Sequence, residues 1–188
     1  MLRRDIPEQA ASCINQSIQE IRQGKQMNIS IQKITPHDDA VICHIIKTVG
    51  AEFGAIGDGF GPSDAEVLHM SEHYCASMRS QYWVARIDGV VVGGCGIAPF
   101  NHSTDTCELR KLFLLPEGRG CGLGRQLVQQ CLSFAQAQGF TQCYLDTLKS
   151  MHAAISLYES LGFEHLAQPL TGTPHCGCDV WMLKKINN

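Results

Sequence analysis

The sequence predicts one α/β domain built on a mixed sheet, and three observations lead to this prediction. Strand-like and helix-like segments alternate through the second half of the chain, which favours parallel pairing there. Two β-rich runs flank Asp88-Gly89, a strong signal for an antiparallel hairpin. The 188 residues are 44% hydrophobic and only 18% charged, which supplies enough apolar side chains for a sizeable core.

Residues 1–26 differ from the rest, and we expect them to be an N-terminal extension to a domain of residues 27–188. Ile14, Ile18 and Ile21 follow helical spacing, and Gly24 would end such a helix. A strand pattern, NISIQKIT, begins directly after Met27. The extension is therefore predicted to be helical and separate from the main domain.

Two helices are predicted before the hairpin. The first begins at Thr35–Asp38, where Thr35 can cap and Pro36 suits the first helical position, and it runs to about Phe53. A glycine-rich loop, GAIGDGFGPSD, follows. Capping-box spacing at Ser63–Glu66 predicts a second helix to about Met78.

The remaining segments complete the order β, α, α, β, β, β, α, β, α, β, β. After the hairpin come the strand CELRKLFLLP, a helix opened by GLGRQLV, the strand FTQCYLDTL, a helix over about 151–161, and the final strand CDVWMLKKI. One face of the first of these helices is apolar, formed by Leu123, Leu127, Val128, Cys131, Leu132 and Ala135.

Charge and composition argue against several classes of protein. The net charge of −3 does not suit a general nucleic-acid or membrane-surface binder, and no apolar run reaches the roughly 18 residues of a spanning helix. Ten cysteines without a CxxC motif are typical of buried free thiols in a reducing cytoplasm, where we expect the protein to reside. HCGC at His175–Cys178 resembles half a zinc site, but no second half has ligand spacing, so we expect no metal.

The run RGCGLG, Arg119–Gly124, lies between a predicted strand and a predicted helix and has the layout of a phosphate-binding loop. Glycines let the backbone approach phosphates closely, and a helix N-terminus favours their negative charge. The P-loop is excluded because its Lys-Ser/Thr is absent. The dinucleotide loop GxGxxG fits poorly, because the third glycine falls one place early.

RGCGLG instead resembles the pyrophosphate loop Q/R-x-x-G-x-G/A of the acetyl-CoA-dependent N-acetyltransferases of the GNAT superfamily, at every defined position. Arg119 and Arg125 flank the loop, and Arg110 and Lys111 lie just upstream. We expect these four cations to gather around one anionic cofactor.

The resemblance covers roughly residues 27–186 and implies a central twisted mixed sheet of about seven strands, flanking helices, and a splayed strand pair that binds CoA. It also implies that Glu108, 11 residues before Arg119, is a general base. The residues implied to bind acetyl-CoA are Leu112, Phe113, Leu114, Arg119, Gly120, Cys121, Gly122, Leu123, Gly124 and Arg125.

A second motif supports the resemblance. The family pattern A-x-x-L-Y-x-x-x-G-F matches residues 154–163, and its tyrosine, Tyr158 here, commonly acts as general acid toward the leaving thiolate. Many members have an asparagine three residues before the alanine, whereas this chain has Met151. We interpret this departure as a subfamily difference.

The resemblance implies transfer of an acetyl group from acetyl-CoA to a primary amine of a small molecule, amino acid or peptide, without a covalent enzyme intermediate. It implies no nucleic-acid or membrane partner, and homodimers are common in the superfamily. Two alternatives stay open: a non-catalytic acyl-CoA sensor or interaction module, and an acyltransferase with another acyl donor or an oxygen acceptor.

The acceptor pocket is expected from the loop 54–64, the second predicted helix, and the loop before the last strand. Acids that could attract an amine there are Asp58, Asp64, Glu66 and Asp179. His152 and His175 are alternative bases. Tyr82 and Trp83 are expected in the core or at an interface and not at a ligand, and Cys121 has no histidine spaced to activate it as a nucleophile.

Overall fold

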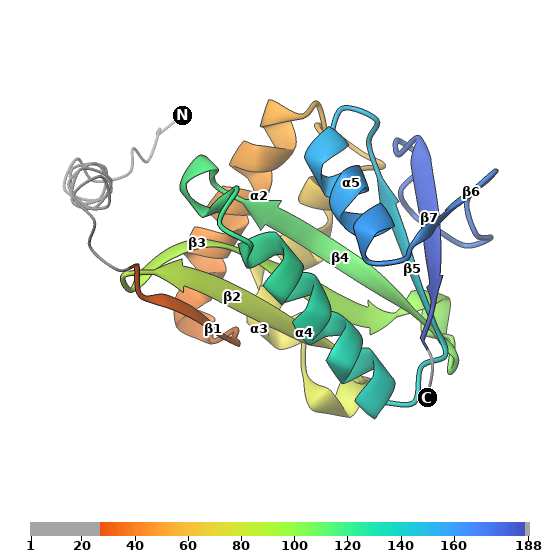
Figure 1. The fold of residues 1–188 in the computed structure, drawn as a ribbon, viewed down its shortest axis with the longest axis horizontal. Helices are drawn as coiled ribbons and strands as arrows, with labels where there is room; N and C mark the ends of the chain where they lie inside the picture. The colour runs from red at the N-terminus through yellow and green to blue at the C-terminus, as the bar shows by residue number, and fades with distance from the viewer. Residues whose placement is uncertain (1–26, 187–188) are drawn as a thin grey trace.

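The computed structural model describes residues 27–186, which form one open mixed sheet with helices on both faces (Figure 1). The strands are β1 (Ile29–Lys33), β2 (Gln81–Ile87), β3 (Val90–Pro99), β4 (Thr106–Leu114), β5 (Gln142–Thr147), β6 (Glu164–Leu166) and β7 (Val180–Lys185). They lie in the order β1-β2-β3-β4-β5-β7-β6, and of these pairs only β4–β5 is parallel. The predicted α/β fold is confirmed, whereas the helix predicted in residues 1–26 lies outside the described residues.

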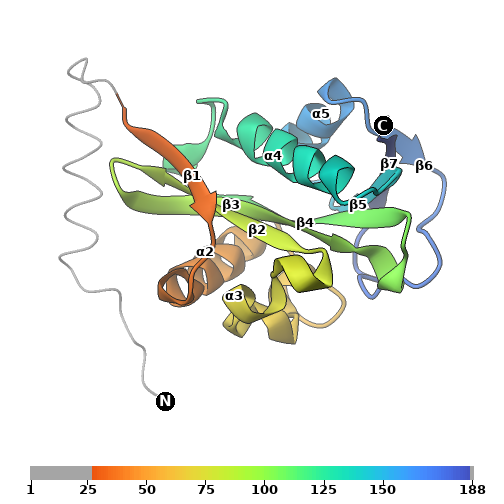
Figure 2. The same ribbon diagram turned by 90° about the horizontal axis from the view of Figure 1, so that it is seen from below.

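The helices divide between the two faces of the sheet (Figure 2). The described helices are α2 (Asp39–Glu52), α3 (Met70–His73), α4 (Leu123–Ala137) and α5 (His152–Ser160). The predicted apolar face of α4 packs on one side, with Leu127 and Cys131 fully buried in one core cluster. On the other side, α2 buries Ile42, Ile45 and Ile46 in a second cluster, so the sheet separates two cores.

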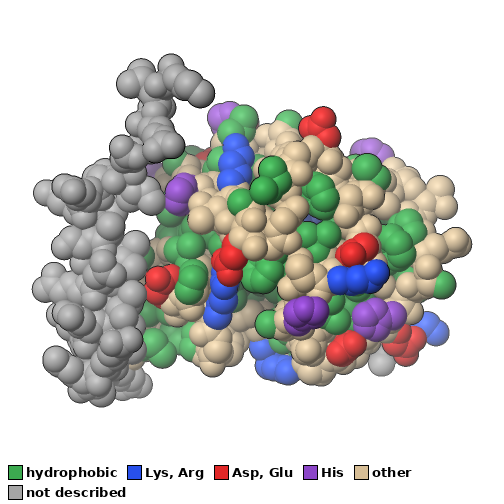
Figure 3. All heavy atoms as spheres, turned by 90° about the horizontal axis from the view of Figure 1, so that it is seen from above, with side chains coloured by type: hydrophobic (Ala, Val, Ile, Leu, Met, Phe, Trp, Pro, Cys, Tyr) green, Lys and Arg blue, Asp and Glu red, His purple; other side chains and the backbone are tan. Residues whose placement is uncertain are grey.

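The surface carries charges of both signs. On the face in Figure 3, acidic and basic side chains are interspersed among apolar and neutral polar ones. No helix within residues 27–186 is long and apolar enough to cross a bilayer.

The predicted start of the first helix is confirmed, although it opens with a turn of 3₁₀ helix at Pro36–Asp38. The Asp38 carboxylate accepts hydrogen bonds from the Thr35 backbone N–H and hydroxyl, at 3.0 and 2.9 Å. These bonds satisfy a donor ahead of α2, as a capping residue does.

The prediction of a second helix from Ser63 to about Met78 is wrong. Residues 61–78 form three short 3₁₀ turns, 61–63, 65–68 and 76–78, and the single-turn helix α3. Glu66, the acid of the expected capping box, and its neighbour Asp64 do not cap a helix. Both side chains form ion pairs with Lys111 of β4 instead, so a tertiary interaction outcompetes the local one.

The predicted hairpin is confirmed at Asp88-Gly89. Both residues have left-handed backbones, with φ of 49° and 83°, as a type I′ turn requires. The Asp88 carboxylate also accepts a hydrogen bond of 3.1 Å from the Asn28 backbone, which ties the turn to the segment before β1.

A bulge interrupts β4 at Lys111, whose backbone is left-handed with a φ of 54°. The β3–β4 register shifts between Gly94 and Gly96, so that two residues of β4 lie opposite one residue of β3. The Tyr82 hydroxyl of β2 donates a hydrogen bond of 3.1 Å to the Lys111 carbonyl. This bond holds the bulge, and the bulge places Lys111 within the charged cluster of the site.

Gly94 and Gly96 leave the space that the Tyr82 ring occupies. A Cβ atom at Gly94 would lie 2.4 Å from a ring carbon of Tyr82, and one at Gly96 would lie 2.6 Å from another. The ring also packs edge-on against Tyr74, with centroids 5.5 Å apart. The glycine pair in β3 therefore determines where the tyrosine hydroxyl reaches β4.

The parallel strands β4 and β5 separate after a short contact. They pair only at Thr106–Glu108 with Gln142–Tyr144, although β4 continues to Leu114. The edge of β4 beyond Glu108 is left without a β5 partner. Its backbone N–H and C=O groups are available to an extended ligand, which could bond there as a strand would.

We predict that Gly94→Ala lowers the free energy of unfolding by about 1–3 kcal/mol, the usual cost of overpacking a core. Urea denaturation would measure the loss. The control Gly89→Asn adds a side chain in an exposed turn where nothing lies within 4 Å, and it should cost much less. Equal stability of Gly94→Ala and the wild type would contradict the role of this glycine.

Candidate active site

The divergence of β4 and β5 opens a cleft of about 320 Å³. Its walls are mainly apolar and come from α2, the end of β4 and the start of α5, while the glycine loop before α4 closes one end. The lining residues are Val49, Phe53, Leu112, Phe113, Leu114, Gly118, Arg119, Gly120, Gly122, Gly124, Arg125, Met151, Ala153, Ala154 and Leu157. A long, partly apolar ligand with an anionic group fits these walls.

The glycine loop presents its backbone to the cleft. Gly120 and Gly122 have left-handed backbones, with φ of 74° and 84°, and Gly122 directly precedes α4. A Cβ atom built on Gly120 would meet nothing within 4 Å, and the closest atom to one on Gly122 lies at 4.0 Å. The start of a 15-residue helix thus lies open to the cleft, which is an arrangement that favours phosphate.

Only two of the four expected cations line this cleft. Arg119 donates to the Leu114 carbonyl at 2.9 Å and pairs with both oxygens of Glu52 at 2.7 Å. Arg125 donates to the Ser160 hydroxyl at 2.7 Å. The expectation that Arg110 and Lys111 join them is wrong, because Glu108 pairs with Arg110, and Asp64 and Glu66 pair with Lys111.

Other predicted cofactor residues contribute backbone or shape. The Leu123 side chain is fully buried in the core, and the Cys121 thiol donates to the Gly118 carbonyl at 3.4 Å. Neither side chain lines the cleft. Met151, which stands where many family members have asparagine, lines it and accepts a hydrogen bond of 3.3 Å from the Thr147 hydroxyl.

A small inner pocket of about 60 Å³ adjoins the cleft, and the two share Leu112, Phe113 and Met151. Phe60, Gly61 and Pro62 form its apolar side, and Glu108, Asp146 and His175 form its polar side. The expected contribution of loop 54–64 to a second pocket is therefore present. Of the expected acids, Asp58 is exposed, and Asp179 accepts a hydrogen bond from the Lys149 backbone at 2.8 Å.

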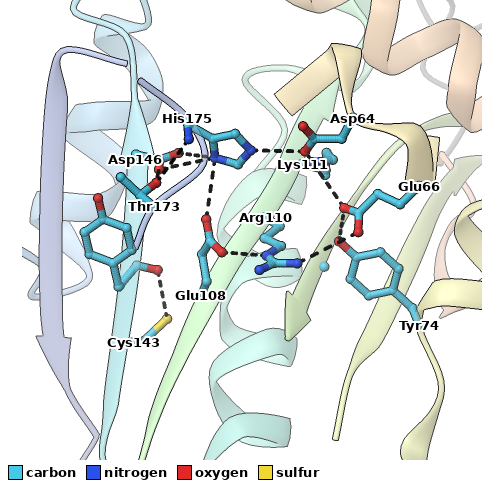
Figure 4. Close-up of polar contacts among 12 residues, drawn as sticks. Asp64, Glu66, Tyr74, Glu108, Arg110, Lys111, Cys143, Asp146, Thr173 and His175 are labelled. Carbon is cyan, nitrogen blue, oxygen red and sulfur yellow. Dashed lines mark hydrogen bonds and ion pairs between the residues drawn. The ribbon is translucent and has the colours of Figure 1, made fainter. Parts of the chain in front are cut away.

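Charged side chains from four segments meet at this inner pocket (Figure 4). The carboxylates are Asp64, Glu66, Glu108 and Asp146, and the cationic partners are Arg110, Lys111 and His175. Most of this charge is withdrawn from water, so each group depends on its neighbours. We call these seven side chains the charged cluster.

Glu108 lies at the centre of the cluster with 1% of its surface exposed. One carboxylate oxygen accepts a 2.6 Å hydrogen bond from Arg110 Nε, and the other lies 3.7 Å from His175 Nδ1. Burial raises the pKa of Glu108, and the Arg110 charge only partly offsets this. A buried carboxylate with a raised pKa is suited to accept a proton.

Lys111 is almost completely enclosed, with 2% of its side chain exposed. Its ammonium group pairs with Asp64 and lies 3.2 Å from Glu66 Oε1. The Glu66 carboxylate also accepts a 3.1 Å hydrogen bond from the Tyr74 hydroxyl. The bulge in β4 thus supplies the cation that anchors the segment between α2 and β2.

His175 joins the loop before β7 to the rest of the cluster. Its Nδ1 lies 3.0 Å from Asp146 Oδ1, and its Nε2 lies 3.0 Å from Asp64 Oδ2. Burial lowers the pKa of His175, but the hydrogen bonds with Asp146 and Asp64 outweigh burial and raise this pKa to about 10. Conversely, burial would raise the pKa of Asp64, but His175 and Lys111 hold it at about 2.

Tyr158 of α5 lies at the inner pocket. Its side chain is 6% exposed and lines the inner pocket, and its hydroxyl makes no hydrogen bond with another residue in the range 27–186. Burial raises the pKa of Tyr158 well above its usual value, so the phenol stays protonated at neutral pH. Tyr82 and Trp83, expected in the core, are buried there.

The sequence analysis missed Asp146 and the ion pairs of Lys111. Asp146 lies in β5 as the acid of an otherwise mainly apolar strand, and this was the available signal for a buried functional group. The sequence suggests His175 as half of a zinc site or as an alternative base, but it does not reveal the acidic partners, which are 29 and 111 residues away in the chain. His152, the other histidine considered, is exposed at the start of α5.

Donor atoms of Glu108, Asp146 and His175 lie within 4.8 Å of one another, a set that could ligate a divalent cation. In the structure each group already has a protein partner. Arg110 bonds to Glu108, while Asp146 accepts from Thr173 at 2.8 Å and pairs with His175. The geometry alone therefore does not require a metal, and its expected absence stays a prediction.

Residues 56–163 match the acetyltransferase (GNAT) family. The uncharacterised N-acetyltransferase YjgM of Escherichia coli is 39% identical over 158 residues, which cover 83% of this chain and 94% of the relative. The chain belongs to the GNAT acetyltransferase family. The cleft and the glycine loop are therefore features of a GNAT acetyltransferase, and acetyl transfer is its general chemistry.

More distant relatives agree on the fold of this GNAT acetyltransferase. Human N-acetyltransferase 8B is 35% identical over 106 residues, which cover 55% of this chain and only 47% of that longer protein. A GNAT-family acetyltransferase of Staphylococcus aureus superposes with a TM-score of 0.72 at 16% identity, covering 85% of this chain and all of that one. A putative acetyltransferase from Salmonella typhimurium, solved with acetyl-CoA, superposes with a TM-score of 0.69 at 23% identity, covering 86% and 95%.

We predict that the stability supplied by His175 declines in alkaline solution. The folded-state pKa of about 10 lies above the ordinary value of 6.5, so this contribution is complete below pH 6.5 and is lost as the pH rises through 10. The difference in unfolding free energy between wild type and His175→Gln should shrink over that window, by at most about 1.4 kcal/mol per pH unit.

Urea denaturation at pH 6, 8 and 9.5 would measure this trend. His165→Gln is the matched control, because His165 forms an exposed pair with Glu159, and surface pairs contribute little. A difference for His175→Gln that stays constant from pH 6 to 9.5 would contradict the assignment.

Proposed function

We propose that this protein transfers an acetyl group from acetyl-CoA to a primary amine of a small molecule, amino acid or peptide, by direct attack of the amine on the thioester. One observation carries the proposal: the cleft that suits CoA meets the acid-lined inner pocket at Leu112, Phe113 and Met151. A thioester at this meeting point would be within reach of groups from both sides.

The cleft supports an extended CoA molecule. In the proposal, the pyrophosphate lies against the glycine loop and the start of α4, where backbone N–H groups and the helix dipole favour negative charge. The pantetheine arm lies along the edge of β4 that β5 leaves unpaired. Both substrates are then held together, which supplies much of the acceleration.

The net charge of the charged cluster beside the inner pocket supports an amine acceptor. Four carboxylates face three cationic groups when His175 is protonated, so the cluster carries a net charge of −1. An ammonium group would balance this charge. Burial makes the attraction stronger than it would be in water.

Glu108 and Tyr158 have the properties that the reaction requires. The carboxylate of Glu108, whose pKa burial raises, takes a proton from the ammonium group. The nitrogen lone pair forms the N–C bond to the acetyl carbon, and the C–S bond breaks as the tetrahedral intermediate collapses. The buried phenol of Tyr158 then gives its proton to the departing thiolate, and CoA leaves as the thiol. The nitrogen gives up its second proton to the resulting tyrosinate, directly or through water, which leaves a neutral amide and restores the phenol.

Thiol release from acetyl-CoA across a panel of amines would test the activity, with calorimetry for acetyl-CoA binding. Amine-dependent thiol release and formation of the N-acetyl product are expected. If acetyl-CoA binds but no amine supports turnover, the sensor alternative replaces the enzyme. Acetylation of hydroxyl compounds alone would favour the oxygen-acceptor alternative.

Gly122→Asp should weaken acetyl-CoA binding by about tenfold or more relative to Gly122→Asn. The two variants share a shape and the strain of a left-handed backbone, so their difference isolates a negative charge placed against the pyrophosphate. Calorimetric titration would measure both affinities. Equal affinities would remove the loop from phosphate binding.

Tyr158→Phe should lower kcat by about 100-fold, a typical contribution of a general acid, and leave acetyl-CoA affinity within about twofold. Steady-state kinetics and calorimetry would measure the two effects. Tyr144→Phe is the control, because Tyr144 is also buried but lines neither the cleft nor the inner pocket. An unchanged kcat in Tyr158→Phe would eliminate the proposed acid.

A further inference from the structure

A third hollow, of about 620 Å³, borders the Glu108–Arg110 pair, and we call it the outer groove. It shares Glu108 and Arg110 with the inner pocket. Its walls come from the segment before β2, the β3–β4 turn and the loop before β7. The other lining residues are His73, Met78, Ser80, Ala98, Pro99, Phe100, Asn101, His102, Gly172 and Pro174.

Arg110 lines both the inner pocket and the outer groove, and Figure 4 shows its contacts with Glu108 and Glu66. Its Nε donates to Glu108, but its Nη1 lies 3.8 Å from Glu66, too far for a hydrogen bond. The terminal nitrogens make no hydrogen bond to any residue in the range 27–186, and 21% of the side chain is exposed. Lys111, by contrast, is enclosed by its acids.

The terminal nitrogens of Arg110, which make no hydrogen bond within residues 27–186, are suited to a carboxylate. A guanidinium group presents its N–H donors in a planar fork that matches the two oxygens of a carboxylate. Glu108 lies beside it, since the two side chains are 2.6 Å apart at Nε and Oε2. A ligand that covers both therefore meets a cation and an anion side by side, which is the complement of the adjacent ammonium and carboxylate groups of an α-amino acid.

The rim of the groove adds a second observation. Asn101 and His102 of the β3–β4 turn both have left-handed backbones, with φ of 44° and 60°. Such conformations cost about 1–3 kcal/mol for residues other than glycine, and they are concentrated at sites that bind ligands. Gly172 packs closely on the Asn101 side chain, since a Cβ atom there would lie 2.4 Å from Asn101 Nδ2. The turn is thus held against the loop before β7 where both border the groove.

We propose that the acceptor is a free α-amino acid, bound in the outer groove with its carboxylate on the Arg110 guanidinium group and its α-amine at Glu108. This inference rests on the proposed function and narrows its amine to one class. The amine faces the inner pocket and the thioester beyond it. The side chain of the amino acid occupies the remainder of the groove, among His73, Ser80 and Met78.

Matched acceptors test the carboxylate directly. For each of the twenty amino acids, the free acid, its carboxamide and its decarboxylated amine are compared by kcat/KM for thiol release. The wild type should prefer the free acid of its substrate by tenfold or more over the carboxamide. Peptides blocked at this carboxylate should be equally poor acceptors.

Arg110→Gln should reduce that preference to about twofold, and Arg110→Lys should retain an intermediate preference, because lysine keeps the charge but not the fork. The readout is the ratio of kcat/KM for the free acid to kcat/KM for the carboxamide. A general loss of activity from the altered Glu108 environment lowers both values and leaves this ratio unchanged. Lys149→Gln removes a cation that is 75% exposed and outside the groove, and it should keep the wild-type ratio.

Binding separates this inference from the proposed function. Calorimetric titration of the same acids and carboxamides into the CoA-saturated protein measures recognition without turnover. If amines are acetylated but free acids are no better than carboxamides, the inference is overturned and the proposed function stands. If nothing is acetylated but acids bind preferentially through Arg110, the groove stands and the proposed function fails. Absence of any acid preference in both assays overturns the inference.

Discussion

The hydrogen bond from the Tyr82 hydroxyl to the Lys111 carbonyl is the constraint on which the site depends. It forms because Gly94 and Gly96 leave room for the tyrosine ring across β3. It holds β4 in a left-handed bulge, which brings the Lys111 ammonium group to Asp64 and Glu66. Those ion pairs replace the local capping that would have made a regular helix of the segment before β2. One buried contact therefore links a glycine pair in the sheet to the shape of the acceptor side.

Burying the charged cluster costs free energy that an apolar core of the same size would not cost. Removing ions from water costs several kcal/mol for each, and apolar residues of similar size often stabilise a fold as well or better. The cluster nevertheless brings together the segment before β2, β4, β5 and the loop before β7, through Asp64, Glu108, Asp146 and His175. Function explains the arrangement better than stability does, since these groups keep Glu108 buried at the inner pocket, which adjoins the cofactor cleft.

The cofactor side and the acceptor side were predictable to different degrees. The glycine loop and its helix are contiguous in the chain, and their chemistry depends on backbone groups that a short motif determines. The fold and the family followed from such local patterns and are confirmed. The acceptor side is assembled from residues that are distant in sequence, such as His175 and Asp64, which are 111 positions apart. No short sequence pattern can predict a pair of residues so far apart in the chain.

The sequence by itself determined the order of most strands and helices, the tight turn at Asp88-Gly89, and the candidate loop at Arg119–Gly124, because hydrophobic periodicity and glycine placement act over a few residues. Tertiary structure alone decided the partners of the charged side chains. It turned Arg110 and Lys111 away from the cofactor loop and broke the helix expected after Ser63. The reason is physical: a buried charge takes the partner that folding brings within about 3 Å, and that partner need not be near in the chain.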